Sequence, residues 1–357
     1  MPKPAIDSMV DFERKIASGG TIGFDEEAET QALETARNEA ASLLGARGQE
    51  IAVLSSATVG ICSFAWSLDL KRGSNVVSTD ADFPSVVYPW MRLAREKGIE
   101  VRLAKNHDGV VNEDELEKLV DDRTAVISIS HVEYGTGQRF DLPWLSELAH
   151  SHGALLIVDA TQSAGLMPID ARQDGMDALV AGGYKGLLGP FGVAIFYLKR
   201  ELVEKLEPPL VGWRSAPDPY GLNVTELTFA GDARKFEYST MNYASPVGLA
   251  ESMRYLRNIG HKNVTRHVLS LTERLIDIVR NSQPETTTLT PEDESAHASI
   301  ASFRFKGRDQ SVIASELVKR RVIVSQRFNG VRFSYHVYNT EQDLLRANEA
   351  LAEILAK

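Results

Sequence analysis

The chain has 357 residues, of which 43% are apolar and 25% are charged, a composition typical of a soluble globular protein with more than one domain. Its formal net charge of −10 argues against nucleic acid and anionic membranes as partners. The single cysteine, Cys62, excludes an intrachain disulfide, the N-terminus lacks the apolar stretch of a secretory signal, and no apolar run reaches the length of a membrane span. We therefore expect a cytoplasmic protein.

Short β-rich runs alternate with amphipathic segments from about residue 50 to residue 200. The expected strands cover 51–56, 75–80, 100–105, 124–131, 154–160, 178–183 and 192–199, and the expected helices cover 85–97, 113–121 and 142–151. Several of these strands are almost entirely apolar, as is typical of strands covered by helices on both faces. The alternation predicts an α/β domain with a mainly parallel, seven-stranded sheet flanked by helices.

The pattern changes after about residue 260. A long amphipathic helix precedes a polar loop, and the β-rich segments 299–307, 322–327 and 331–336 then alternate with helices. Thr340, with Asp343 three residues later, has the spacing of a capping box, which predicts the start of the last helix. We predict a large α/β domain over residues 15–255 and a small α+β domain over residues 256–357, with residues 1–14 packing near the small domain.

Polar side chains stand at the ends of three predicted strands. Asp159 ends "LLIVD" and Gln162 follows it, Lys185 comes after "ALVAGGY", and the hydroxyl-rich segment 55–58 comes after "IAVL". Open parallel sheets bind ligands at the carboxyl ends of their strands, so these features are expected to converge. Each also has an ordinary interpretation. Asp159 and the segment 55–58 could cap helices, and the amine of Lys185 could reach solvent.

Together the three features suit an aromatic aldehyde cofactor that carries a phosphate. A desolvated lysine has a lowered pKa and can act as a nucleophile that forms a Schiff base. A carboxylate at a strand end can keep a pyridinium nitrogen protonated, and hydroxyls at a helix N-terminus can hold a phosphate. No cluster of histidine, cysteine and carboxylate residues has the spacing of a metal site, so no metal is expected.

From about residue 35 to its end, the chain resembles the class V aminotransferases. These are fold-type I pyridoxal 5'-phosphate (PLP) enzymes that include cysteine desulfurases, kynureninases and isopenicillin N epimerase-like proteins. The resemblance rests on "VDATQSAG", "GGYKGLLGPFG" and "VRFSYHVYNTEQD". It implies the fold-type I PLP-transferase fold, PLP as cofactor, a small amino acid as substrate, and a homodimer with active sites at the subunit interface.

The resemblance also assigns roles by position. Lys185 matches the catalytic Schiff-base lysine, Asp159 the partner of the pyridinium nitrogen, and Gln162 the residue near the ring hydroxyl. The remaining cofactor contacts that it implies are Ala57 and Thr58 in the phosphate loop, Phe83 stacked on the ring, Tyr184 before the lysine, and Thr240, which reaches the phosphate of the neighbouring subunit.

The expected substrate contacts lie mainly near the C-terminus. Arg332 matches the family arginine that binds the substrate α-carboxylate, for which a planar guanidinium is well suited. The alternative for Arg332 is a solvent-exposed strand arginine. Arg327 is a second candidate for the same site, and His131 is either a packing residue or a substrate contact.

One departure from the family bears on the reaction. Desulfurases carry a catalytic cysteine just before the arginine strand, whereas this chain has only "SQRFNG" there, so desulfurase activity is not expected. We expect an aminotransferase that works through an external aldimine and a Cα carbanion, with Lys185 as the base. A β-lyase (a C–S lyase) or an epimerase of the same family is the alternative. A non-catalytic PLP-fold binding protein is disfavoured because Lys185, Asp159, Gln162 and Arg332 occur together.

Overall fold

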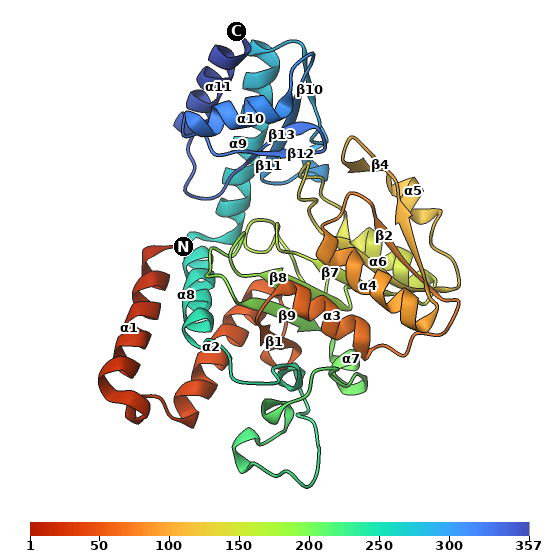
Figure 1. The fold of residues 1–357 in the computed structure, drawn as a ribbon, viewed down its shortest axis with the longest axis vertical. Helices are drawn as coiled ribbons and strands as arrows, with labels where there is room; N and C mark the ends of the chain where they lie inside the picture. The colour runs from red at the N-terminus through yellow and green to blue at the C-terminus, as the bar shows by residue number, and fades with distance from the viewer. Residues whose placement is uncertain (357) are drawn as a thin grey trace.

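The computed structural model describes residues 1–356 and has a seven-stranded sheet at its centre (Figure 1). The strands lie in the order β1-β9-β8-β7-β6-β2-β3. They cover Ile51–Leu54 (β1), Asn75–Thr79 (β2), Glu100–Ala104 (β3), Thr124–Ser130 (β6), Leu155–Asp159 (β7), Ala178–Gly182 (β8) and Ala194–Leu198 (β9). Neighbours from β8 to β3 are parallel, and β9 runs antiparallel to both β1 and β8. The predicted mainly parallel, seven-stranded sheet is confirmed.

Helices cover both faces of this sheet. They are Lys3–Gly19 (α1), Glu26–Leu44 (α2), Ala57–Ser67 (α3), Pro84–Lys97 (α4), Glu113–Glu117 (α5), Leu142–Ser151 (α6), Arg200–Lys205 (α7) and Ala244–Ile259 (α8). In β8, Ala178 and Val180 belong to the apolar core shared with α3 and α4, whereas Leu179 and Ala181 belong to the core shared with α2, α6 and α8. Because helices bury both faces of the sheet, most of its strands consist mainly of apolar residues.

A second, smaller sheet forms the other part of the molecule, at the top of Figure 1. Its strands lie in the antiparallel order β10-β11-β13-β12 and pack against three helices. The elements are His261–Ser282 (α9), Thr286–Thr288 (β10), Ile300–Phe305 (β11), Gln310–Lys319 (α10), Ser325–Arg327 (β12), Gly330–Ser334 (β13) and Glu341–Leu355 (α11). The predicted capping box is present, because Thr340 N donates to Asp343 Oδ2 at 2.8 Å.

The two parts meet at a helix break. Gly260, with φ of 91°, separates α8 from α9, so the predicted boundary between residues 255 and 256 falls inside the last turns of α8. We propose Gly260 as the division between the domains, because its backbone conformation suits glycine and ends the helix. The N-terminal helix α1, which covers residues 3–14 of the predicted segment 1–14, packs along α8, on the large-domain side of Gly260. Within the described residues, no helix has both the length and the apolarity to cross a membrane.

Candidate active site

Side chains from several strand ends line one pocket at the carboxyl edge of the main sheet. They are Ser56, Ala57, Thr58, Phe83, Ser85, Ser130, Tyr134, Asp159, Thr161, Gln162, Gly182, Tyr184 and Lys185. The strand β1 is parallel to β8 because both run antiparallel to β9, so its carboxyl end reaches the same edge. The structure therefore brings together all of the predicted cofactor residues except Thr240.

A tight loop between β8 and β9 presents Lys185 to this pocket. Gly183 N donates to Val193 O at 2.9 Å, and Gly189 N donates to Gly183 O at 2.7 Å, so the loop folds back on its own start. A Cβ atom at Gly189 would lie 3.0 Å from the Gly183 carbonyl oxygen. The glycines in "GGYKGLLGPFG" thus permit the close backbone contacts that hold the lysine at the sheet edge.

The amine of Lys185 lies among aromatic rings. Its Nζ atom is 5.6 Å from the centre of the Phe83 ring and 5.8 Å from that of Tyr184. Burial lowers the pKa of Lys185, the charge of Asp159 opposes that shift, and the nearby Arg332 adds to it. A lysine with a lowered pKa holds more of its amine in the neutral, nucleophilic form.

Asp159 ends β7 and is tied to the end of β8. Its Oδ1 atom accepts a hydrogen bond of 2.8 Å from Thr161 N, and Thr161 Oγ1 accepts one of 3.0 Å from Gly182 N. Burial raises the pKa of Asp159, while hydrogen bonds from Thr161 and the charge of Lys185 oppose the shift. The carboxyl is thus held in a fixed orientation beside the lysine, where it can meet a positively charged ring nitrogen.

Hydroxyl groups gather where α3 begins. Ser56 Oγ accepts from Val59 N at 3.2 Å and caps the helix, and the hydroxyls of Thr58 and Ser85 lie 2.9 Å apart. The N–H groups of a helix's first turn have no partner within the helix, so Ala57 and Thr58 can offer theirs to an anion. The chemistry of this corner of the pocket fits a phosphate.

Gly182, at the end of β8, has no side chain that could contact a phosphate, and its surroundings leave little room for one. A Cβ atom at this position would lie 3.2 Å from Tyr184 Cε1 and 3.3 Å from Thr161 Cγ2. These contacts are tighter than usual, so a serine here requires its neighbours to shift.

Asp82 does not line the pocket but is hydrogen-bonded to two residues that do, Ser130 and Phe83, and the sequence did not single it out. It follows β2 and accepts hydrogen bonds from Ser130 N at 2.8 Å, from Ser130 Oγ at 2.6 Å and from Phe83 N at 2.7 Å. Burial, together with the charge of Asp159, raises the pKa of Asp82 to about 7. Its position two residues after the predicted strand 75–80 was the available signal, because the same rule had identified Asp159.

We expect Asp82→Asn to change how stability depends on pH. The folded protein keeps the Asp82 proton up to about pH 7, whereas the unfolded chain loses it near the ordinary value of 3.8. Wild-type stability therefore falls as pH rises between these values, relative to a variant with a neutral amide. Urea unfolding of the cofactor-free proteins between pH 4 and pH 8 measures this difference.

The control is Asp80→Asn, on the same loop. The hydrogen bonds from Asn106 and Lys105 lower the pKa of Asp80 despite some desolvation, so its stabilising contribution is lost as pH falls rather than as pH rises. Parallel stability curves for wild type and Asp82→Asn across the whole range would contradict the assignment of a proton to Asp82.

Arg332 reaches the main sheet from the small one. Its Nη1 atom donates to Tyr134 O at 2.5 Å, its Nη2 atom donates to Ser325 Oγ at 3.3 Å, and its buried Nε atom has no hydrogen-bond partner among residues 1–356. Burial lowers the pKa of Arg332, and Arg327 adds to that shift. The side chain is half-buried, so the alternative of a solvent-exposed strand arginine is wrong.

Tyr134 connects the arginines to the pocket. Its ring packs edge-on against Phe83 at 5.6 Å, and the guanidinium carbon of Arg327 lies 5.9 Å from the centre of the same ring. Contacts thus lead from Lys185 through Phe83 and Tyr134, which line the pocket, to Arg327, which lies beyond its lining. Arg327 is exposed, and its Nη1 atom donates to the carbonyl of the neighbouring Gln326.

Four predicted site residues lie outside the pocket lining: Arg327 and Arg332 on the hairpin, and His131 and Thr240. His131 is 4% exposed, and burial together with the charge of Arg139 lowers its pKa to about 3, which suits a neutral packing residue. Its Nδ1 atom has no hydrogen-bond partner in the described part of the chain. Thr240 is exposed on the segment before α8.

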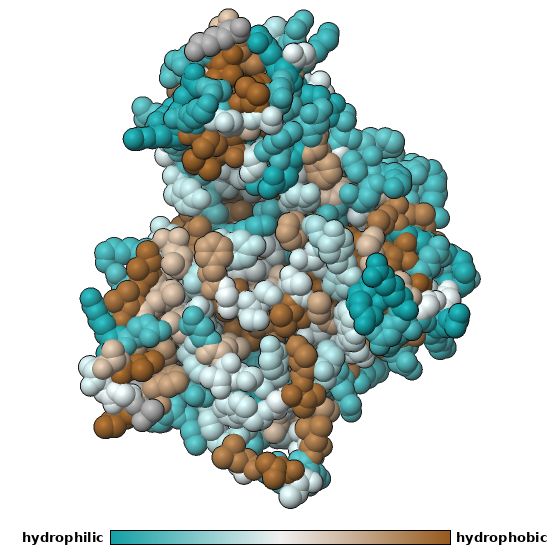
Figure 2. Space-filling model, viewed as in Figure 1, coloured by the Kyte–Doolittle hydropathy of each residue, from teal (hydrophilic) through white to brown (hydrophobic). Residues whose placement is uncertain are grey.

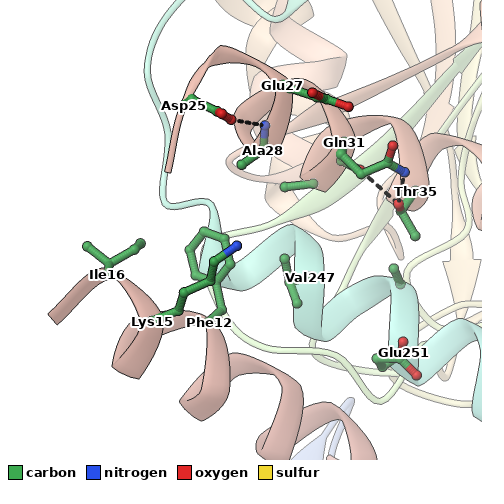
Figure 3. Close-up of a pocket in the computed structure, with 12 residues that line it drawn as sticks. Phe12, Lys15, Ile16, Asp25, Glu27, Ala28, Gln31, Thr35, Val247 and Glu251 are labelled. Carbon is green, nitrogen blue, oxygen red and sulfur yellow. Dashed lines mark hydrogen bonds between the residues drawn. The ribbon is translucent and has the colours of Figure 1, made fainter. Parts of the chain in front are cut away.

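A separate groove of about 440 Å³ lies between α1, α2 and α8 (Figure 3). Asp25 caps α2 there by accepting from Ala28 N at 3.0 Å, and Gln31 bonds to Thr35 one turn further on. None of the predicted site residues lines this groove.

Comparison with known proteins identifies the family. Residues 1–347 match the family model described as "Aminotransferase class-V". The chain belongs to the class V aminotransferase family. Members of this family are enzymes that use PLP, and the lysine, the carboxyl and the hydroxyl-lined helix start of the pocket fit that cofactor.

Individual relatives of this class V enzyme carry two different descriptions. The uncharacterized aminotransferase YcbU of Bacillus subtilis is 32% identical over 324 residues, covering 91% of this chain and 83% of the relative. A probable cysteine desulfurase of Methanothermobacter thermautotrophicus is 29% identical over 345 residues, covering 91% and 84%. The apo cysteine desulfurase from Thermococcus onnurineus NA1 is 25% identical with a TM-score of 0.89, covering 100% of this chain and 92% of that one.

Proposed function

We propose that this class V enzyme is an aminotransferase acting on a small amino acid. The observation that carries the proposal is the joint placement of Lys185, Asp159 and the hydroxyl-rich start of α3 in one pocket, with Arg332 reaching the adjoining wall. Bound PLP supplies an electron sink that stabilises negative charge at the substrate Cα atom. With the cofactor in place, Lys185 is positioned to remove the Cα proton and to return it at another atom.

The other residues position cofactor and substrate. We assign Asp159 to the ring nitrogen and Gln162 to the ring hydroxyl, and Arg332 to the substrate carboxylate, with Arg327 as a second, more exposed cation at the same wall. The remaining proposed contacts are Ala57 and Thr58 with the phosphate, Phe83 and Tyr184 with the ring faces, and Thr240 with the phosphate of a second subunit.

A homodimer is part of the proposal. The exposed position of Thr240, outside the pocket of its own chain, suits a contact with a neighbouring subunit. Apolar side chains also reach the surface on the long segment between α7 and α8, which forms the bottom of Figure 1: Leu222 is 71% exposed, Val224 95% and Leu227 62%. Figure 2 shows apolar surface at the same end of the molecule. Exposed apolar clusters of this kind favour a protein interface.

Cysteine desulfurase activity fits this chain less well than aminotransferase activity, because it needs a cysteine near the substrate. The hairpin before Arg332 turns through Phe328 and Asn329 and contains no cysteine. The only cysteine, Cys62, lies on α3, and burial raises the pKa of its thiol, which leaves it a weak nucleophile. A sulfur-accepting thiol at the substrate is therefore missing from this chain.

A β-lyase that cleaves C–S bonds is the second candidate function. The sequence similarity to probable cysteine desulfurases favours a sulfur-bearing substrate. A lyase of this kind needs no protein thiol, because the sulfur leaves with its own substituent. The residues that form the Cα carbanion are the same for both reactions, so the pocket alone supports both.

The deciding experiment is a titration of the PLP-loaded enzyme with the common amino acids, followed by a product assay. We expect one amino acid to change the visible absorption of bound PLP and to yield its keto acid only when a second keto acid is added. Release of pyruvate and ammonia without an added keto acid would replace the aminotransferase by the lyase. No response to any amino acid, cystine included, would contradict both.

A further inference from the structure

The hairpin that carries Arg332 turns through an unusual pair of residues. Phe328 and Asn329 connect β12 to β13, with φ of 45° and 55°, and Arg327 pairs with Gly330 across the turn. Two left-handed residues match the type I′ turn, which normally takes Asn-Gly. A bulky aromatic residue in this conformation is strained, so its presence calls for a compensating contact.

The Phe328 ring packs on two glycines of the large domain. A Cβ atom at Gly109 would lie 2.7 Å from Phe328 Cδ2, and one at Gly135 would overlap the same ring. Gly109 has φ of 85°, which by itself favours glycine, but Gly135 has no such requirement. The ring of Phe328 is therefore the reason that position 135 has no room for a side chain.

Arg304 holds the same turn to the large domain. Its guanidinium donates to both carboxylate oxygens of Asp108 at 3.0 and 2.6 Å. Its Nε atom also donates to Asn329 O at 3.2 Å, and its Nη2 atom lies 3.5 Å from Phe328 O. Asp108 belongs to the turn between Asn106–His107 (β4) and Val110–Val111 (β5), so one arginine joins the tips of two hairpins.

We infer that Phe328 is a positioning residue that locks the β12–β13 hairpin onto the large domain and thereby sets the place of Arg332. The Phe328 ring contacts Gly135, and Arg332 donates to the carbonyl of Tyr134, the residue next to it. The Tyr134 ring lies 5.8 Å from that of Phe328. The inference rests on the proposed role of Arg332 as the substrate carboxylate contact.

The test combines two single variants and their double. Phe328→Ala removes the ring, Gly135→Ala pushes the ring away, and the double variant removes the overlap. In the PLP-loaded enzyme, we expect each single variant to weaken amino-acid binding about 10- to 100-fold, as misplacement of a binding group does, with PLP affinity within about twofold of wild type. The double variant is expected to bind no more weakly than Phe328→Ala alone, because the two residues act through one contact.

Controls separate positioning from general loss of structure. Ile323→Ala removes a side chain that is 79% exposed on the small domain, and it is expected to leave amino-acid affinity unchanged. Phe328→Tyr keeps the ring and is expected to retain most of the affinity. Additive losses in the double variant, or amino-acid affinity within twofold of wild type in Phe328→Ala, would overturn the positioning role.

A second measurement needs no substrate. Amide hydrogen exchange of the PLP-loaded proteins is expected to be faster at residues 325–332 in Phe328→Ala than in wild type, with exchange in β6 and β7 unchanged. Unchanged exchange over 325–332 would overturn the proposal that Phe328 holds the β12–β13 hairpin on the large domain, even if the wild-type enzyme binds no amino acid. If the enzyme binds no amino acid but residues 325–332 exchange faster in Phe328→Ala, the proposed function is contradicted and the role of Phe328 in holding the hairpin is supported.

Discussion

Lys185→Ala is expected to lower kcat at least about 10²- to 10⁴-fold, the range typical for loss of a general base, and to change the absorption of bound PLP to that of the free cofactor. The structure gives the reason. Burial lowers the pKa of this amine, and the amine lies in the same pocket as Asp159, so the wild-type side chain combines nucleophilicity with position. Alanine supplies neither. Stopped-flow absorbance and steady-state turnover with the amino acid that binds wild type measure both effects.

Burial alone does not mark a lysine as catalytic, and the chain provides its own comparison. Lys235 is buried and its pKa is also lowered by burial, yet its Nζ atom donates to Val203 O at 2.6 Å, away from the pocket. Lys118 is exposed and serves as the control for loss of a lysine outside the pocket, so Lys118→Ala is expected to leave turnover unchanged. Turnover in Lys185→Ala within tenfold of wild type would remove the lysine from the reaction.

Much of the large domain could be predicted from the sequence because most of its strands are buried on both faces; the edge strand β3 is only partly buried. An apolar run of four to eight residues between turn signals marks such a strand, and each of the seven was placed within two residues of its observed ends. The strand β10 was missed, because Thr286–Thr288 is a polar edge strand with no apolar periodicity. The helices α1 and α2 were also missed, since they precede the alternating pattern.

The candidate site likewise contains residues that local sequence patterns predict and residues that they do not. Asp159, Lys185 and the segment 55–58 lie at or just after the ends of predicted strands. Because open parallel sheets bind ligands at the carboxyl ends of their strands, the sequence predicted that these residues lie close together. The contact between Arg332 and Tyr134 joins residues 198 positions apart and depends on how the small sheet packs on the large one. The burial of His131 likewise follows from packing that no local pattern records.

Arg332→Lys is expected to raise KM for the amino acid about 10- to 100-fold with a smaller effect on kcat. Loss of hydrogen bonds to a charged group typically costs about 1.5–3 kcal/mol, which corresponds to this range. The wild-type guanidinium donates to Tyr134 O and Ser325 Oγ through its two Nη atoms. A lysine has a single ammonium group on a flexible stem and cannot make these contacts and a bidentate carboxylate contact together.

The assignment can be separated from a general electrostatic effect by comparing two ligands and two arginines. Wild type is expected to prefer an amino acid to the amine that lacks its carboxylate, and Arg332→Lys is expected to lose most of that preference. Arg327→Lys is the matched control, because Arg327 lies on the same hairpin but is exposed and contacts the Tyr134 ring. If Arg327→Lys abolished the preference and Arg332→Lys retained it, the carboxylate contact would belong to Arg327. In that case Arg332 would serve to join the two domains through Tyr134.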